Sequence, residues 1–265
     1  MARTTTLIAA LLATIVSVSS SANAQQWGTL KGRFVYEGTA PKPPKINLAT
    51  SNDQYCKNLK TPLFVESLLV DAKGGLAGVA VYIRQKRGST LKIHPDYAAA
   101  AKSQAVLDNT SCHFVPHVLV MRTSQELLIK NSDATGHNTN ISSLRNPPFN
   151  TLIPANGNST HRFKVAESLP IGVVCNIHPW MKSFVLVRNN PYMTITGSDG
   201  SFEISNLPAG KHEFVFWHES KGNLKKVSLG EAGKTNRKGR AKLEIPAGGT
   251  LDLGDVKIAP AVLGL

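Results

Sequence analysis

Short β-branched runs separated by turn residues make up most of the chain, and helical periodicity is nearly absent. Runs of this length and spacing are typical of a β-sandwich or barrel. Only Pro95–Ala105, with proline in its first turn and an alanine run behind it, favours a helix. The sequence therefore predicts an all-β protein. Its predicted strands before residue 190 are Thr29–Tyr36, Leu63–Val70, Gly78–Arg84, Phe114–Met121, Glu126–Lys130, His161–Val165, Ile171–Cys175 and Phe184–Val187.

The first 24 residues have the organisation of a secretory signal peptide. Arg3 provides a positive start, and Leu7–Val18 is an apolar run that is short for a membrane span. Small residues then precede polar Gln25, so we expect cleavage after Ala24. An uncleaved anchor is the alternative. The sequence thus predicts a periplasmic or secreted protein without stable membrane insertion.

Composition is that of a globular protein with a basic surface. The 265 residues are 42% hydrophobic and 18% charged, which is enough to bury a core without disulfides. The formal net charge of +13, one lower after signal removal, favours acidic partners. No C2H2 spacing, arginine-rich run or helix-turn-helix pattern is present, so nucleic-acid binding is not expected.

Three cysteines in an exported chain leave one thiol without a partner. Cys175 is the expected free thiol, because its neighbourhood resembles a metal site. Cys56 and Cys112 then pair by elimination. The alternative is that all three are small buried apolar residues.

A set of metal-binding side chains follows the end of a predicted strand. Cys175 is followed by His178 and Met181 at intervals of three, and His137 comes just after another strand. Two imidazoles and a thiolate with a weak axial thioether are the ligands of a blue copper site. Zinc is the main metal alternative, but thioether is a poor zinc ligand. A core without a metal is the other alternative. A thiol protease is not expected, because Cys175 and His178 share one tight loop.

Residues 114–188 resemble a cupredoxin. The loop Cys175-x2-His178-x2-Met181, with Pro179 and Trp180 inside it, is similar to the short ligand loop of amicyanins. The resemblance implies a Greek-key β-sandwich that holds one type 1 copper.

The stretch Gly136-His137-Asn138 resembles the Pro-His-Asn of amicyanins and plastocyanins, with glycine in place of proline. In that family Asn138 would tie the His137 loop to the Cys175 loop. We expect His137 to lie deeper than His178, whose outer edge should reach the surface between Pro179 and Trp180. Those two residues would form a patch for electron transfer.

The mature chain also resembles exported proteins, common in planctomycete-like bacteria, that are often labelled methylamine utilisation proteins; the label rests on the copper motif. Residues 196–210 are similar to the hairpin of carboxypeptidase-regulatory-like, transthyretin-like modules. We therefore divide the chain into a signal peptide (1–24), an N-terminal β elaboration with one short helix (25–105), a cupredoxin domain (106–190) and a second small antiparallel β-sandwich (191–265). Whether the N-terminal strands join the cupredoxin sheet or the C-terminal module is left open.

Together these observations predict a one-copper electron carrier, not an enzyme, that serves exported and acidic redox partners. The alternative is a non-redox protein that holds copper or binds a matrix. His113 and His117 flank a Val-Pro pair near Cys112 and could form an accessory metal site, although such histidines are more often ordinary strand residues.

Overall fold

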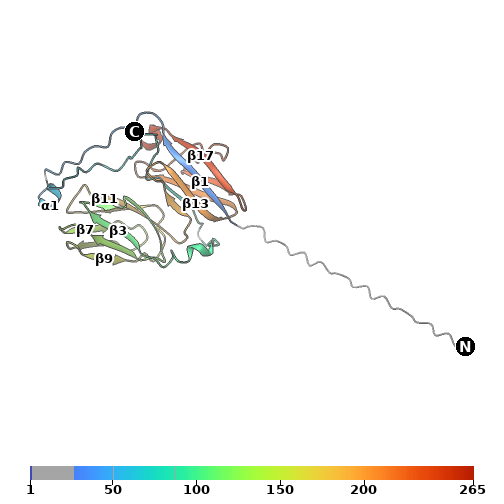
Figure 1. Ribbon diagram of the computed structural model, residues 1–265, viewed down its shortest axis with the longest axis horizontal. Coiled ribbons are helices and arrows are strands. Elements are labelled where there is room, and N and C mark those ends of the chain that lie inside the picture. The colour runs from blue at the N-terminus through green and yellow to red at the C-terminus, as the bar shows by residue number, and fades with distance from the viewer. Residues whose placement is uncertain (2–26, 50, 87) are drawn as a thin grey trace.

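The computed structural model describes residue 1 and residues 27–265, except residues 50 and 87. The predicted signal peptide lies outside the described residues. Almost all regular structure is β, which confirms the all-β fold class (Figure 1). Within the described residues, the helical segments are two single turns and one 3-10 turn: α1 (Gln54–Lys57), α2 (Pro260–Leu263) and η1 (Pro95–Tyr97).

Two sheets built from residues 105–188 face each other and form what we call the central unit (Figure 1). Their apolar faces enclose a core that contains Leu107, Ile129, Val173 and Val185. The first sheet has the order β4 (His113–Val115), β3 (Ala105–Thr110), β6 (Leu127–Asn131), β9 (Asn158–His161). The second has the order β5 (Val118–Arg122), β11 (Lys182–Arg188), β10 (Ile171–Val174), β7 (His137–Ile141), β8 (Phe149–Ile153).

Two further sheets form what we call the composite unit, because strands from both ends of the chain build it. They enclose a second core that contains Phe34, Phe214 and Phe216. One sheet has the order β13 (Ser201–Pro208), β1 (Trp27–Tyr36), β17 (Thr250–Ile258). The other has the order β12 (Met193–Ile195), β2 (Ala80–Ile83), β14 (Gly210–His218), β15 (Gly222–Asn223), with β16 (Arg240–Ile245) also on β14. The N-terminal strands β1 and β2 thus pair with the C-terminal module.

The two units are joined face to face by strands that are buried on both sides. Along β2, Val81 and Ile83 enter the composite core, whereas Ala80 and Tyr82 enter a third cluster between the units. In β11, Leu186 belongs to this third cluster. Because side chains alternate along a strand, a continuous apolar run serves two cores at once. The molecule is therefore a stack of four sheets.

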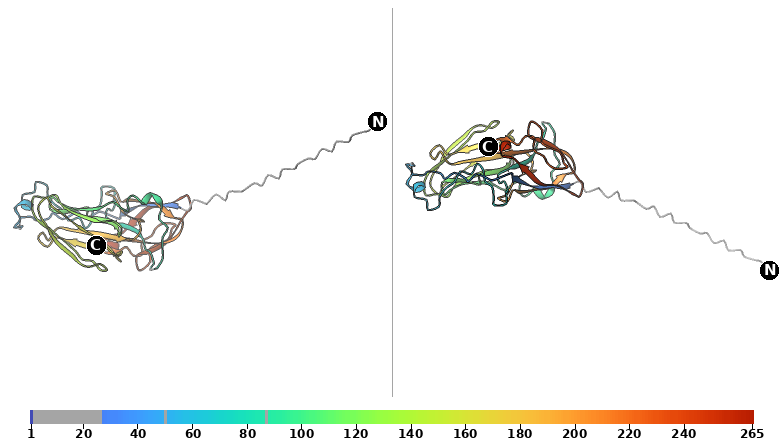
Figure 2. Two further views of the ribbon diagram at one scale, coloured as in Figure 1. Left: turned by 90° about the horizontal axis from the view of Figure 1, so that it is seen from below. Right: turned by 90° about the horizontal axis from the view of Figure 1, so that it is seen from above.

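The chain between β1 and β2 leaves the composite unit and reaches the far end of the central unit, where α1 lies (Figures 1 and 2). A disulfide between Cys56 and Cys112 fixes α1 to the turn between β3 and β4. We call residues 51–66 the cover segment, because Asp53 within it lies against the buried ring of His178.

Three local predictions were wrong. The strand predicted for His161–Val165 lies earlier in the chain, as β9 (Asn158–His161), and residues 162–165 are irregular. Pro95–Ala105 forms only η1 followed by turns, because its alanines are largely exposed and offer no apolar stripe for a helix to bury. Leu63–Val70 is not a strand but contains two isolated bridges, at Phe64 and Val70. The strands β3, β7 and β8 were not predicted.

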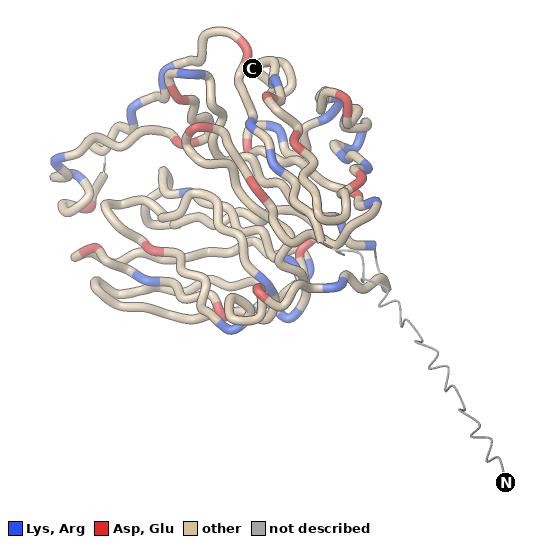
Figure 3. The backbone as a smooth tube through the Cα atoms, turned by 45° about the vertical axis from the view of Figure 1, so that its right-hand side comes forward, with Lys and Arg blue, Asp and Glu red and all other residues tan. Residues whose placement is uncertain are grey.

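Lys and Arg are scattered over both units and interspersed with acids (Figure 3). The basic charge therefore forms no single face in that view. Among the described residues, no helix is long and apolar enough to cross a membrane.

A charged cluster connects the cover segment, the central unit and the composite unit. His117 forms an ion pair with Glu66 (Nδ1–Oε2 3.3 Å) and a short contact with the buried Glu219. Lys182 lies 3.9 Å from Glu219 on the same side. Burial opposes protonation of His117, but the two carboxylates outweigh it and raise its pKa to about 9.

This cluster predicts a pH dependence of folding. A histidine whose pKa is about 6.5 unfolded and about 9 folded stabilises the fold fully below pH 6.5, and that stabilisation is lost as pH rises through 9. Glu219→Gln should flatten this loss when unfolding free energies are measured by denaturant between pH 6 and 9.5. The exposed Glu244→Gln is the control and should keep the wild-type slope. An equal slope in all three proteins would contradict the assignment.

Candidate metal centre

Three donor atoms from separate places in the central unit meet in its core. His137 begins β7, Cys175 directly follows β10, and His178 lies in the loop from β10 to β11. The Nδ1 atoms of the two histidines are 2.9 Å apart, and Cys175 Sγ is 3.7 Å from His178 Nδ1. All three side chains are buried. The structure therefore brings three of the four predicted ligands to one point.

The loop from Cys175 to Met181 is closed by its own backbone. The N–H of Cys175 donates to the carbonyl of Met181, and the N–H of Met181 donates to the carbonyl of His178. These bonds continue the antiparallel pairing of β10 with β11 into a tight turn. The Met181 side chain is buried in the same apolar cluster as Cys175. Its part as an axial ligand stays a prediction.

Asn138 connects the two strands that carry the ligands. Its side-chain oxygen accepts from the N–H groups of Asn176 (2.6 Å) and Ile177 (3.3 Å), and its amide donates to Asn150. The backbone N–H groups of Asn138 and His178 also bond Cys175. Asn138 thus connects the strand of His137 to the loop that follows Cys175.

Asp133 is a functional residue that the sequence reasoning missed. Its Oδ2 accepts from His137 Nε2 (2.8 Å) and from the N–H of Cys112 (2.8 Å). Its Oδ1 accepts from the Tyr55 hydroxyl and from the N–H of Ser111. A carboxylate on the remote nitrogen fixes the ring and leaves Nδ1 free to bind a metal. The only available signal was an acid four residues before a ligand histidine.

The cover segment places a second carboxylate behind the other histidine. Asp53 Oδ2 lies 3.4 Å from His178 Nε2, and the same carboxylate bonds Thr135. As a result, the His178 side chain is 1% exposed. The expectation that its outer edge reaches the surface was therefore wrong. Asp53 lies in the long connection between β1 and β2. Local sequence patterns cannot predict that this connection packs over the loop that contains His178.

Pro179 and Trp180 differ in their surroundings. Pro179 is exposed, but Trp180 is half-buried and packs against the central core. Its indole N–H donates to the carbonyl of Cys112 (3.0 Å), and its ring lies 5.2 Å from the His178 ring. A cavity of about 620 Å³ between the cover segment and this loop is lined by Asp53, His178, Pro179 and Trp180 among others.

The electrostatics of the site favour a thiolate. Burial opposes ionisation of Cys175, but hydrogen bonds with His137 and His178 outweigh it and lower the pKa of the thiol to about 6. Burial likewise opposes protonation of His137, but Asp133 and Cys175 raise its pKa to about 9. Both shifts favour a thiolate at Cys175 beside an imidazolium at His137.

The donor set fits a metal ion. Ligands about 2.0–2.3 Å from one ion in a trigonal plane lie roughly 3.5–4 Å from one another. The three donor atoms all lie within 4.8 Å of one another and need only small shifts to reach that arrangement. Two imidazoles with a thiolate suit copper, and with a water in a fourth position they would also suit zinc. The thioether of Met181, buried in the same cluster as Cys175, favours copper, because thioether is a poor zinc ligand.

The other two histidines proposed as metal ligands, His113 and His117, do not lie together in a metal-binding cluster of the described residues. The ring of His113 contacts the carbonyl of Ser111, and His117 is held by Glu66 and Glu219. No cluster of metal-binding groups in the described part of the chain includes His113 or His117. Cys56 and Cys112 form a disulfide, and Cys175 is free.

Comparisons with known proteins place the likeness in part of the chain. No family model and no curated protein matches. Among solved structures, a reduced copper(I) form of an amicyanin variant is 19% identical over 32% of this chain and 82% of its own, with a TM-score of 0.29. A purple cupredoxin from Nitrosopumilus maritimus is 19% identical over 32% of this chain and 99% of its own, with a TM-score of 0.27. A copper nitrite reductase from Thermus scotoductus is 17% identical over 40% of this chain and 25% of its own, with a TM-score of 0.29. At these TM-scores the argument for the site rests on its geometry.

The position of Trp180 predicts a structural effect. Trp180→Ala should lower the free energy of unfolding by about 2–4 kcal/mol, because packing is lost and the Cys112 carbonyl loses its donor. Trp180→Phe keeps an aromatic ring but removes the N–H donor, so this substitution should lower the free energy of unfolding by only about 1 kcal/mol. Denaturant unfolding measures both. Unchanged midpoints would mean that Trp180 is only a surface residue.

The disulfide predicts a second effect. It closes a loop with a sequence separation of 56, so Cys56→Ala/Cys112→Ala should lower the free energy of unfolding by roughly 4 kcal/mol at most. Because the bond fixes the cover segment, Cys175 in the double variant should also react faster with a thiol reagent. Equal labelling rates in both proteins would show that the cover segment stays in place without it.

Proposed function

We propose that this chain is an exported type 1 copper protein that carries single electrons between redox partners in the periplasm or outside the cell. The observation that carries the proposal is the convergence of His137 Nδ1, His178 Nδ1 and Cys175 Sγ inside a β-sandwich core. We further propose that Met181 is the weak axial ligand and that the chain is not an enzyme.

Copper in such a site supplies reversible one-electron exchange. The protein's part is to hold the ligands in nearly one arrangement. Backbone bonds close the Cys175 loop, Asn138 fastens it to β7, and Asp133 orients His137. The lowered pKa of the Cys175 thiol favours the thiolate that a metal requires, and metal binding would displace the proton that the raised pKa of His137 retains.

An electron cannot reach a partner through an exposed edge of His178, because that side chain is buried. His178 is covered by Asp53, while Pro179 remains exposed beside the adjoining cavity. We propose that partners dock near Pro179 and that the basic surface attracts acidic ones. Such encounters are brief and use small interfaces, under about 1,200 Å² in total. Their rates should fall as salt rises.

Copper loading tests the proposal. Purified mature protein should bind one copper(II) per chain and show the intense thiolate charge-transfer colour. Cys175→Ser and His178→Gln should abolish that colour, whereas His161→Gln, a histidine outside the site, should keep it. A protein that binds zinc in preference and stays colourless with copper would overturn the proposal.

The axial position has its own matched control. Met181→Leu should leave a coloured site with a changed reduction potential, because the axial ligand tunes the potential rather than holding the metal. Met193→Leu, between the two units, should change neither. Colour that no small-molecule or protein reductant discharges would favour copper holding instead.

A further inference from the structure

A second cavity, separate from the candidate metal centre, has a mainly cationic lining. It has a volume of about 680 Å³, within the roughly 300–1,000 Å³ of small-molecule sites. Residues from the composite unit, the central unit and the link between them line it. Its cationic lining residues are Arg84, Lys86, Arg145, Lys164, Arg188 and Arg240, and Glu167 is its one acidic lining residue.

Arg188, at the end of β11, is the central observation. It is 6% exposed, yet no carboxylate of the described residues forms an ion pair with it. Its guanidinium donates to the carbonyls of Glu167 (2.9 Å) and Ile83 (3.4 Å), and its Nε has no partner. Buried charges are normally paired, because removing an ion from water without a counter-charge is costly.

The neighbours of Arg188 add charge rather than neutralise it. Arg84 and Arg145 repel it, and after burial they are the groups that lower its pKa. Tyr82, whose ring faces the guanidinium at 5.1 Å, opposes this lowering of the Arg188 pKa, but it is a neutral phenol at neutral pH and supplies no counter-charge. Arg145 donates to the carbonyl of Ala166 and forms no ion pair with any acid that the structure describes, and Lys164 is exposed at the rim.

The acids near this cavity are already engaged. Glu167 accepts from the N–H groups of Leu144, Arg145 and Asn146 and from the Asn146 amide. Glu213 bonds Arg84 at 2.8 Å and lies 3.9 Å from Arg240. Two acids therefore face six cations.

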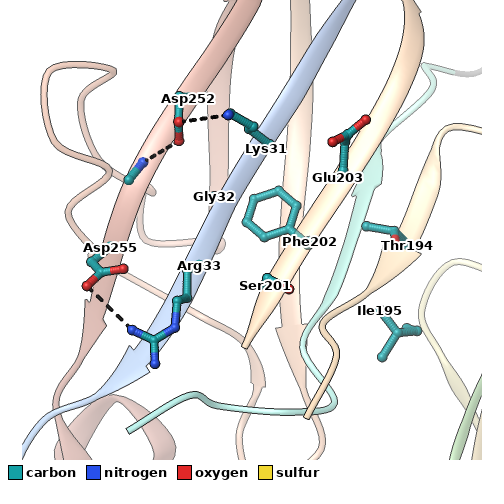
Figure 4. Close-up of a pocket in the computed structure, with 11 residues that line it drawn as sticks. Lys31, Gly32, Arg33, Thr194, Ile195, Ser201, Phe202, Glu203, Asp252 and Asp255 are labelled. Carbon is teal, nitrogen blue, oxygen red and sulfur yellow. Dashed lines mark hydrogen bonds and ion pairs between the residues drawn. The ribbon is translucent and has the colours of Figure 1, made fainter. Parts of the chain in front are cut away.

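The cavity on the composite unit shown in Figure 4 is the useful contrast. There Lys31 pairs with Asp252 (3.3 Å) and Arg33 pairs with Asp255 (3.6 Å), so its cations need no external partner. Basic residues in a pocket do not by themselves indicate a ligand. The excess of unpaired cations distinguishes the second cavity.

We infer that this cavity binds a small molecule through an oxyanion group, a phosphate or a carboxylate, held between Arg188, Arg145 and Lys164. Planar guanidinium groups match such groups with paired charge-assisted hydrogen bonds. The bound anion would supply the counter-charge that Arg188 lacks and would connect the two units. This site is separate from the metal centre and does not depend on the function proposed for it.

The test is calorimetric titration of the full mature chain with inorganic phosphate and, separately, citrate, at constant ionic strength maintained with sodium chloride. At least one anion should bind saturably and raise the unfolding midpoint, since a ligand of the folded state stabilises it. A preference for phosphate or for citrate identifies the group. Arg145→Gln/Lys164→Gln, which changes only exposed side chains, should weaken binding at least tenfold.

The matched control is Lys42→Gln/Lys257→Gln, which removes the same charge from exposed sites outside the cavity. It should bind as the wild type does. Equal weakening in both double variants would show general surface attraction and overturn the inference. So would the absence of saturable binding by either anion. Because Arg188 is buried, Arg188→Gln can change the unfolding midpoint by itself. For this variant the quantity compared is therefore the rise of the midpoint on adding the anion, which should disappear.

Discussion

The buried carboxylate of Asp133 makes the hydrogen bonds on which the geometry of the candidate metal centre depends. It accepts hydrogen bonds from His137, from the turn at Ser111 and Cys112, and from Tyr55 on α1. One side chain therefore orients a ligand histidine, anchors the disulfide turn and fastens the cover segment. Its pKa is lowered because these donors, His137 first, outweigh the effect of burial. A charged acid at this point is stable only while all of these parts are in place.

The stacked sheets give this site a rigid support. Strand β11 has one face in the central core and the other in the cluster between the units, so it cannot move without disturbing both. The ligand loop connects β10 to β11 and inherits that rigidity. Rigid ligands need little rearrangement when a metal changes charge, which is the property an electron carrier requires.

The sequence predicted the parts of the site that are local. Cys175, His178 and Met181 occupy one loop, and their spacing predicted a metal site once it was combined with an upstream histidine after a strand and with the β context. His137 could be found because it follows an apolar run and precedes Asn138. Asp53 could not, since only the long excursion between β1 and β2 brings it to His178.

The fold shows the same division. Turn signals and short apolar runs predicted the all-β class, but the pairing of β1 with β13 and β17 depends on residues distant in the chain. The segment after Pro95 failed as a helix because propensity without an apolar face is not sufficient. The burial of His178 could not be predicted from the Cys175–Met181 motif, because the motif contains no information on the distant segment that packs over it.

X-ray absorption at the copper edge tests the central claim most directly, because it identifies the atoms bound to the metal. Copper-loaded mature protein should show one short sulfur and two imidazole nitrogens, with nearly the same arrangement in the oxidised and reduced states. Cys175→Ser should lose the sulfur. A first shell of nitrogen and oxygen alone in the wild-type protein would contradict the account.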